Sequence, residues 1–159
     1  MESVAAPAVR DKLPGAILFM CGMNSIRSPM AEALAKSLLP VGVYVASAGV
    51  RPGVRDTFVD VVLDEIGLSL GRKQPQLLED LEDAFFDVIV TLTPEAHHLA
   101  LELTRASAVE VIYWPTLDPT VATETREQII SAYRAVRDQL QMLIETRLLD
   151  KNGVPDQNA

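Results

Sequence analysis

The residues best suited to chemistry lie in one short segment, residues 21–29, with the sequence Cys-Gly-Met-Asn-Ser-Ile-Arg-Ser-Pro. Cys21 is the only cysteine of the chain, and five residues separate it from Arg27. A loop of this length can turn several backbone N–H groups toward one tetrahedral anion, and an arginine can add two parallel hydrogen bonds. The same groups favour a thiolate over a thiol. The segment therefore predicts a nucleophilic cysteine beneath a bound oxyanion.

The residues around Cys21 and Arg27 have types that suit such a loop. Ser28 can donate its hydroxyl to the sulfur and so stabilise a thiolate. Asn24 tolerates a left-handed backbone better than most residues, which suits a tight curl. We expect the loop that binds the anion to consist of Gly22, Met23, Asn24, Ser25 and Ile26.

Transfer of a phosphoryl group to sulfur also requires a proton for the departing oxygen. Asp118, which precedes Pro119, is the candidate acid. A bound dianionic ester raises the pKa of a neighbouring carboxyl, so Asp118 could donate a proton and then accept one from water. The alternative is structural, because Asp-Pro commonly begins a turn.

Short apolar strands that alternate with helices must position these residues. We expect strands at residues 16–20, 43–46, 86–92 and 109–113, and helices at residues 30–39, 58–66, 94–103 and 123–149. This order predicts a three-layer α/β/α fold with a four-stranded parallel sheet. Ligands of such sheets bind at the carboxyl ends of the strands. Cys21 and Asp118 should therefore lie at the same edge.

Composition narrows the class of protein further. The 159 residues suit one domain, residues 1–159, with loose tails at residues 1–14 and 152–159. The net charge of −8 argues against nonspecific nucleic-acid binding. A single cysteine excludes an internal disulfide and suits a reducing compartment. No apolar run approaches the ~20 residues of a membrane span. We expect a cytoplasmic protein that binds neither nucleic acid nor membrane.

The motifs taken together resemble a known family. Cys21, Asn24, residues 27–29 and residues 31–32 resemble the signature of the low-molecular-weight protein tyrosine phosphatases, whose fold the thioredoxin-coupled arsenate reductases share. Residues 47–49, with Gly53 after them, and Asp118-Pro119 fall where that family has its supporting serine and its acid. The resemblance extends from about residue 16 to residue 149.

This resemblance implies hydrolysis of phosphomonoesters through a phosphocysteine, without a metal or an organic cofactor. Cys21 would be the nucleophile, Arg27 the phosphate clamp and Asp118 the acid and then the base. Ser28, Asn24 and Ser47 would support the loop. The substrate would be a phosphorylated protein or a small phosphorylated compound: phosphotyrosine, phosphoarginine and small esters remain open, as does the oligomeric state.

The sequence departs from the family pattern at several positions. Met23 stands where the phosphatases usually have glycine, and Ile26 stands where many have a second cysteine. Thr120 and Val121 replace the tyrosines that often follow Asp-Pro. Two alternatives therefore remain: an arsenate reductase that uses an external thiol, and a module that binds phosphate or a phosphoprotein without turnover.

Overall fold

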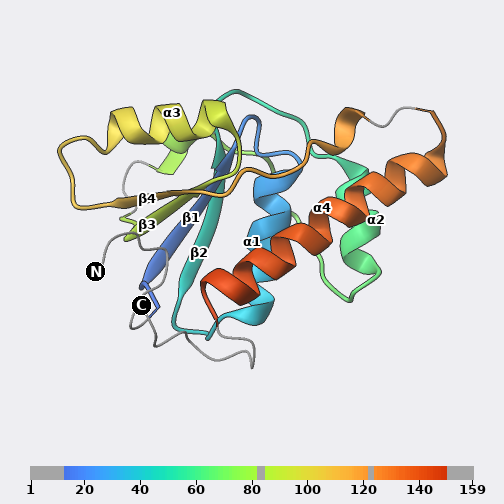
Figure 1. Cartoon of the computed structure of the whole chain (residues 1–159), viewed down its shortest axis with the longest axis horizontal. Helices are drawn as coiled ribbons and strands as arrows, with labels where there is room; N and C mark the ends of the chain where they lie inside the picture. The colour runs from blue at the N-terminus through green and yellow to red at the C-terminus, as the bar shows by residue number, and fades with distance from the viewer. Residues whose placement is uncertain (1–12, 82–84, 122–123, 150–159) are drawn as a thin grey trace.

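A single parallel sheet forms the centre of the protein (Figure 1). The structure, a computed structural model, describes residues 13–81, 85–121 and 124–149. The strands are β1 (Ala16–Cys21), β2 (Tyr44–Gly49), β3 (Val88–Thr91) and β4 (Glu110–Tyr113), in the order β2-β1-β3-β4. All three neighbouring pairs are parallel, so the predicted four-stranded parallel sheet is confirmed.

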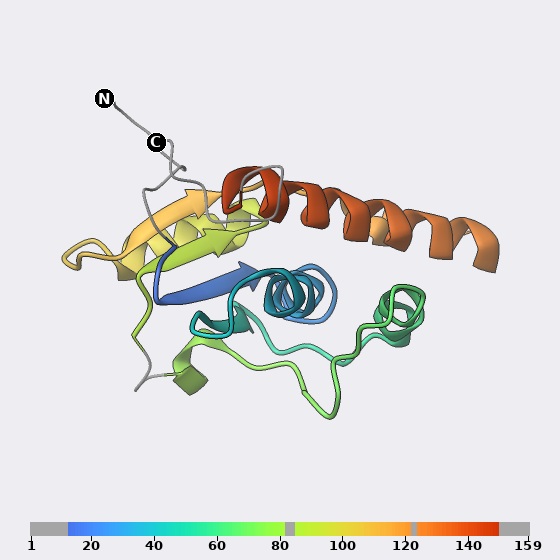
Figure 2. The same ribbon diagram turned by 90° about the horizontal axis from the view of Figure 1, so that it is seen from below.

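Helices cover both faces of this sheet (Figures 1 and 2). They are α1 (Arg27–Leu38), α2 (Thr57–Asp64), α3 (Pro94–Leu103) and α4 (Arg126–Arg147), with short 3-10 helices η1 (Leu78–Leu81) and η2 (Pro119–Val121). Side chains alternate along β1: Phe19 joins the core beneath α1, α2 and α4, and Met20 joins the core beneath α3. The predicted three-layer α/β/α architecture is therefore confirmed.

Two boundaries, the start of α1 and the end of β2, differ from the expected ones. Helix α1 begins at Arg27 rather than at residue 30, since Pro29 lies in its first turn, where a missing N–H has no intrahelical partner to lose. Strand β2 continues to Gly49 because Ser47 pairs with Phe19, and Gly49 with Cys21, in the parallel register. As a result, Arg27 and Ser28 lie in the first turn of α1, and Ser47 lies in β2.

The long helix expected at residues 123–149 is α4, and its start is set by a capping box. The Thr125 side chain accepts from the backbone of Gln128, and the Gln128 side chain accepts from the backbone of Thr125. The helix therefore begins at Arg126. The tails expected at residues 1–14 and 152–159 lie outside the described residues, except for residues 13–14. None of the described helices is long and apolar enough to span a membrane.

Candidate active site

Cys21 ends β1, and the loop that follows it turns directly into α1. Its thiol is buried, with the residue 4% exposed. The backbone N–H of Ser28 donates to Cys21 Sγ over 3.4 Å, and Ser28 Oγ lies 3.0 Å from the same sulfur. Two groups from the first turn of α1 therefore meet the sulfur, as the sequence predicted for Ser28.

Asn24 holds the curl of the loop through its backbone and its side chain. Its φ is 56°, the left-handed conformation that its type predicted. Asn24 Nδ2 donates to Ser28 Oγ at 2.8 Å and to Ser47 Oγ at 2.9 Å. Its Oδ1 accepts from the backbone N–H of Gln76 at 2.9 Å. One side chain thus connects the loop to α1, β2 and the segment before η1.

A buried carboxylate sets the direction of these hydrogen bonds. Ser47 Oγ donates its single hydrogen to Glu32 Oε1 over 2.6 Å, so it can only accept from Asn24. Asn24 then uses both amide hydrogens, one toward Ser47 and one toward Ser28. Ser28 consequently accepts from Asn24 and keeps its own hydrogen for Cys21 Sγ; its other acceptor, Ala48 O, is 3.5 Å away.

Two lysines neutralise this buried carboxylate. Glu32 has only 3% of its side chain exposed, and Lys36 Nζ lies 2.6 Å from Oε2. Lys73 Nζ lies 3.4 Å from Oε1. No role was expected from the sequence for Glu32, Lys73 or Gln76. The available signal was the spacing of Ser28 and Glu32, four residues apart on one helix, because such residues share a face.

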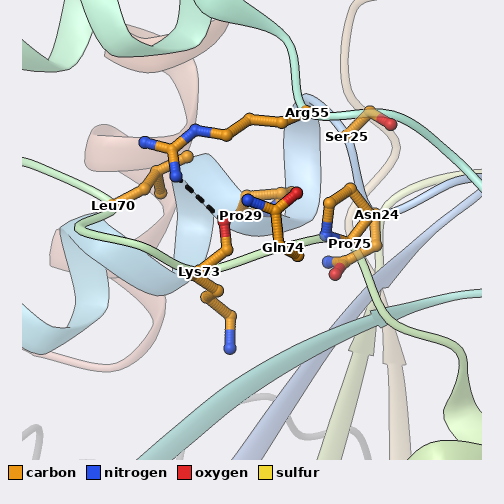
Figure 3. A pocket seen from close by; sticks show the side chains of 8 residues that line it. All are labelled: Asn24, Ser25, Pro29, Arg55, Leu70, Lys73, Gln74 and Pro75. Atoms are coloured by element: carbon orange, nitrogen blue, oxygen red, sulfur yellow. Dashed lines mark hydrogen bonds between the residues drawn. The ribbon is translucent and has the colours of Figure 1, made fainter.

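Lys73 and Gln76 are positioned by a segment that lies against the loop (Figure 3). Arg55 Nη1 donates to the carbonyls of Gly71 at 2.7 Å and Lys73 at 3.0 Å, and its other nitrogens bind Asp60. A small cavity of about 10 Å³ remains here, lined by Asn24, Ser25, Pro29, Arg55, Leu70, Lys73, Gln74 and Pro75. This volume suits at most about one water, so we assign the region a supporting role.

Two glycines allow the loop to approach β2 closely. A Cβ on Gly49 would lie 2.7 Å from the backbone N of Asn24 and 2.7 Å from the backbone C of Met23. A Cβ on Gly53 would overlap the carbonyl oxygen and the Cβ of Met23. Backbone atoms cannot move aside as a flexible side chain does, so these two positions exclude larger residues.

Asp118 lies in a loop that Arg27 contacts. Arg27 Nη1 donates to the carbonyls of Thr116 at 3.2 Å and Leu117 at 3.4 Å. Asp118 Oδ1 accepts from Thr120 Oγ1 at 2.6 Å and from Thr120 N at 3.0 Å. The hydrogen bond from the Thr120 hydroxyl, aided by its backbone N–H and by the charge of Arg27, lowers the pKa of Asp118. The carboxyl is therefore ionised near neutral pH.

An open pocket of about 180 Å³ brings the candidate residues together at the carboxyl edge of the sheet. Its lining includes Cys21, Arg27 and Asp118, four of the five loop residues (Gly22, Met23, Ser25 and Ile26), and Arg51 and Thr120. The supporting residues Asn24, Ser28 and Ser47 are buried beneath it. Cys21 and Asp118 share this edge, as the fold predicted.

No three His, Cys, Asp or Glu side chains among residues 13–81, 85–121 and 124–149 are grouped so that they could hold a metal ion. His97 Nδ1 lies 2.8 Å from Thr91 Oγ1, and its ring stacks on Tyr113. This histidine therefore belongs to the packing between α3 and the sheet.

Cys21 at the end of the first strand, Arg27 at the start of the next helix and Asp118 of the Asp-Pro loop line one pocket at the sheet edge. The chain belongs to the low molecular weight phosphotyrosine protein phosphatase family, whose model matches residues 16–148. Members of this family include phosphatases and arsenate reductases.

Individual relatives carry both kinds of name. A protein-arginine-phosphatase of Geobacillus stearothermophilus is 31% identical over 152 residues, which cover 87% of this chain and 97% of the relative. An arsenate reductase of Halalkalibacterium halodurans is 31% identical over 131 residues, covering 82% and 92%. Among solved structures, the YwlE arginine phosphatase from Geobacillus stearothermophilus superposes with a TM-score of 0.70 at 26% identity, covering 83% and 89%.

Proposed function

We propose that this protein is a metal-independent phosphatase that hydrolyses phosphomonoesters or related phosphoryl groups through a phosphocysteine. The observation that supports this most is the environment of Cys21. Its sulfur receives the N–H of Ser28, faces the Ser28 hydroxyl, and lines one pocket with Arg27 and Asp118. A sulfur with such partners is stabilised as a nucleophile and again as a leaving group.

The proposed reaction has two displacements at phosphorus. In the first, the Cys21 thiolate forms an S–P bond while the P–O or P–N bond to the leaving group breaks, and protonated Asp118 gives its proton to the departing atom. In the second, water attacks phosphorus, ionised Asp118 takes a proton from it, and the S–P bond breaks to restore the thiolate. Arg27 and the N–H groups of the loop hold the phosphoryl oxygens throughout.

Proton donation by Asp118 is consistent with its lowered pKa when the substrate is counted. In the free protein Thr120 and Arg27 favour the carboxylate. A bound dianion draws on the charge of Arg27 and adds its own negative charge nearby, and both changes raise the pKa of Asp118. The proton that reaches the leaving group therefore arrives with the substrate or is taken up as it binds.

The residues that line the pocket favour some phosphorylated substrates over others. None of the described residues that line the pocket is aromatic, so a phosphotyrosine ring would have no side-chain ring to stack on there. Phosphoarginine, the substrate class named for the Geobacillus relative, is an alternative that needs no such ring. We assign the whole chain to one cytoplasmic domain with phosphorylated proteins or small phosphorylated compounds as substrates.

Arsenate reduction is the second candidate, because several relatives are named arsenate reductases. The chain has one cysteine, so it cannot pass an oxidised adduct to a second thiol of its own. In this version Cys21 bonds to arsenic(V), two external thiols supply two electrons, and arsenite, a disulfide and water leave. A module that binds phosphate without turnover is the third possibility.

One set of assays distinguishes these activities. Wild type, Cys21→Ser and Asp118→Asn are compared on an aryl phosphate and on a phosphoarginine peptide. We expect turnover that disappears in Cys21→Ser and falls roughly 10²–10⁴-fold in Asp118→Asn with a poor leaving group. Arsenate-dependent oxidation of glutathione without phosphatase turnover would favour the reductase. Tight phosphate binding without Cys21-dependent turnover of either kind would leave only the binding module.

A further inference from the structure

Arg51 is a second cation in the pocket to which the proposed chemistry gives no role. It lines the same pocket as Cys21, Arg27 and Asp118. The backbone N–H groups of Val50 and Arg51 both donate to the carbonyl of Gly22, at 2.8 and 2.9 Å. The backbone that carries Arg51 is therefore held against the first residue of the loop, and the Arg51 side chain lines the pocket above it.

The Arg51 guanidinium holds a carboxylate in the structure. Arg51 Nε lies 2.9 Å from Glu95 Oε2, and Nη2 lies 3.0 Å from Oε1, a bidentate pair. Glu95 belongs to the first turn of α3. Both side chains are open to solvent, 57% and 43% exposed. Exposed ion pairs contribute little to stability, so Arg51 can exchange this carboxylate for another at small cost.

Gly22 makes room for this pair above the loop. A Cβ there would lie 3.2 Å from Arg51 Nη2 and 3.3 Å from Glu95 Oε1. The carboxylate bound to Arg51 is thus held directly over the residue that follows the nucleophile. A substrate carboxylate in the place of Glu95 would lie next to the phosphoryl group held by the loop.

The surroundings of the pocket suit a polypeptide rather than a small metabolite. Met23, which lines the pocket, is 42% exposed. Leu117 and Val121, which flank Asp118 and Thr120 in the chain, are 56% and 79% exposed. Apolar side chains around a polar pocket bury area against neighbouring residues of a bound segment.

We infer that Arg51 determines specificity: it selects phosphorylated protein segments that carry an aspartate or glutamate next to the phosphorylated residue, and that carboxylate replaces Glu95 on the guanidinium. This inference rests on the proposed function for its catalytic readout. The net charge of −8 repels acidic partners in general, so the preference is local to Arg51.

The test uses two peptides of equal length with the phosphorylated residue that wild type turns over faster, phosphotyrosine or phosphoarginine; one peptide has glutamates beside that residue and the other has glutamines. Wild type should show a kcat/KM roughly 2- to 5-fold higher for the acidic peptide, the size expected for one exposed ion pair. Arg51→Gln should make the two values about equal. Glu95→Gln, which frees Arg51, should widen the preference beyond that of wild type.

A second exposed ion pair controls for net charge. Glu102 Oε2, near the end of α3, lies 3.2 Å from Nη2 of Arg105, which follows that helix. Arg105→Gln and Glu102→Gln change the total charge as the test variants do, and each should retain the wild-type ratio. Equal losses for both peptides in Arg51→Gln would overturn the inference and assign Arg51 to the phosphorylated residue itself.

Measurements of peptide binding test this inference independently of the proposed function. In a Cys21→Ala background, which has no nucleophile to accept the phosphoryl group, fluorescence anisotropy gives the dissociation constants of both peptides. A preference for the acidic peptide that is lost on adding Arg51→Gln supports the inference even if wild type proves inactive. Normal turnover of an aryl phosphate by wild type, with equal affinities for the two peptides, refutes the inference and leaves the phosphatase proposal intact.

Discussion

Ser47 on β2 donates its hydroxyl hydrogen to Glu32 on α1 over 2.6 Å, in a buried contact between residues 15 positions apart. A carboxylate can only accept, so this bond leaves Ser47 with no hydrogen for Asn24. The Asn24 amide must therefore donate to Ser47 and to Ser28, and Ser28 is left to donate to Cys21. The Glu32 carboxylate, which does not line the pocket, thus orients the Ser28 hydroxyl toward Cys21 Sγ.

Replacement of Glu32 by Gln should test this orientation. A glutamine amide can donate as well as accept, and it no longer attracts Lys36 and Lys73. We expect the free energy of unfolding to fall by about 1–3 kcal/mol, because a buried charge-assisted bond is lost. We also expect a lower kcat on an aryl phosphate. Urea denaturation and steady-state kinetics measure the two effects, and Glu102→Gln in an exposed pair serves as the control with little change.

Two replacements of Asn24 separate its backbone role from its side-chain role. Asn24→Gly and Asn24→Ala both remove the bonds to Ser28, Ser47 and Gln76. Of the two residues, only alanine is strained in the left-handed conformation at φ 56°, at a cost of about 1–2 kcal/mol. Thermal or urea unfolding should therefore find the glycine variant more stable than the alanine variant by roughly 1 kcal/mol. Equal stabilities would show that the loop relaxes to another conformation.

Gly49→Ala should damage both the fold and the site. Its Cβ would lie 2.7 Å from backbone atoms of Met23 and Asn24, so the loop would have to move away from β2. We expect a loss of about 1–3 kcal/mol in stability and a large loss of Cys21-dependent turnover. Gly42→Ala is the matched control, because nothing lies within 4 Å of its added Cβ. An active, stable Gly49→Ala protein would contradict the described approach of loop to strand.

The contact between α2 and α4 should make stability depend on pH. Glu65 accepts from Arg134 and also from Arg137, and the bond from Arg134 is the main reason that the pKa of Glu65 falls from 4.5 to about 2. A folded-state pKa below the unfolded value stabilises the protein above the unfolded value. That contribution should be lost as the pH falls from about 4.5 toward 2.

Glu65→Gln isolates this contribution. The variant should melt below wild type at pH 7, and the difference in Tm should shrink as the pH is lowered through the same window. Differential scanning calorimetry at several pH values between 7 and 3 gives the comparison. A Tm difference that stays constant across this range would mean that the arginines do not depend on the charge of Glu65.

Thr120→Val should change the pH profile of catalysis. The Thr120 hydroxyl bond at 2.6 Å is the largest cause of the lowered pKa of Asp118, so its removal should raise that pKa toward its ordinary value. More of the protein then carries the proton that the proposed acid must donate. The alkaline limb of kcat/KM for a poor leaving group should move to higher pH. Asp118→Asn should lack this limb, and an unmoved limb in Thr120→Val would argue against Asp118 as the acid.

The parallel sheet and the sheet-edge location of the site could be predicted because they depend on local patterns. The apolar runs at residues 16–20 and 109–113 predicted strands. Because helices alternate with such strands along the chain, the strands are expected to be parallel. Boundaries were less predictable. The extension of β2 to Gly49 depends on pairing with β1, and the start of α4 depends on the capping box at Thr125.

The supporting residues beyond the motif could not be predicted, because their partners are distant in the chain. Lys73 and Gln76 reach Glu32 and Asn24 only after a segment more than 40 residues away folds against α1. Glu32 belongs to the signature that the sequence resembles, but its contact with Ser47 joins an α-helix to a strand and could not be read from spacing alone. Arg51 lies in a turn-prone segment, and its contact with Glu95 joins residues 44 positions apart.

The sequence by itself determined the local chemistry: a lone cysteine five residues before an arginine, an asparagine suited to a left-handed curl, and a strand and a helix on either side. These follow from residue type and spacing, which act over a few bonds. Only the tertiary structure decided that Glu32 orients the hydroxyls beneath the pocket, and that Arg51 lines this pocket with Cys21 and Asp118. Such contacts exist only when the buried sheet brings separate strand ends to one edge.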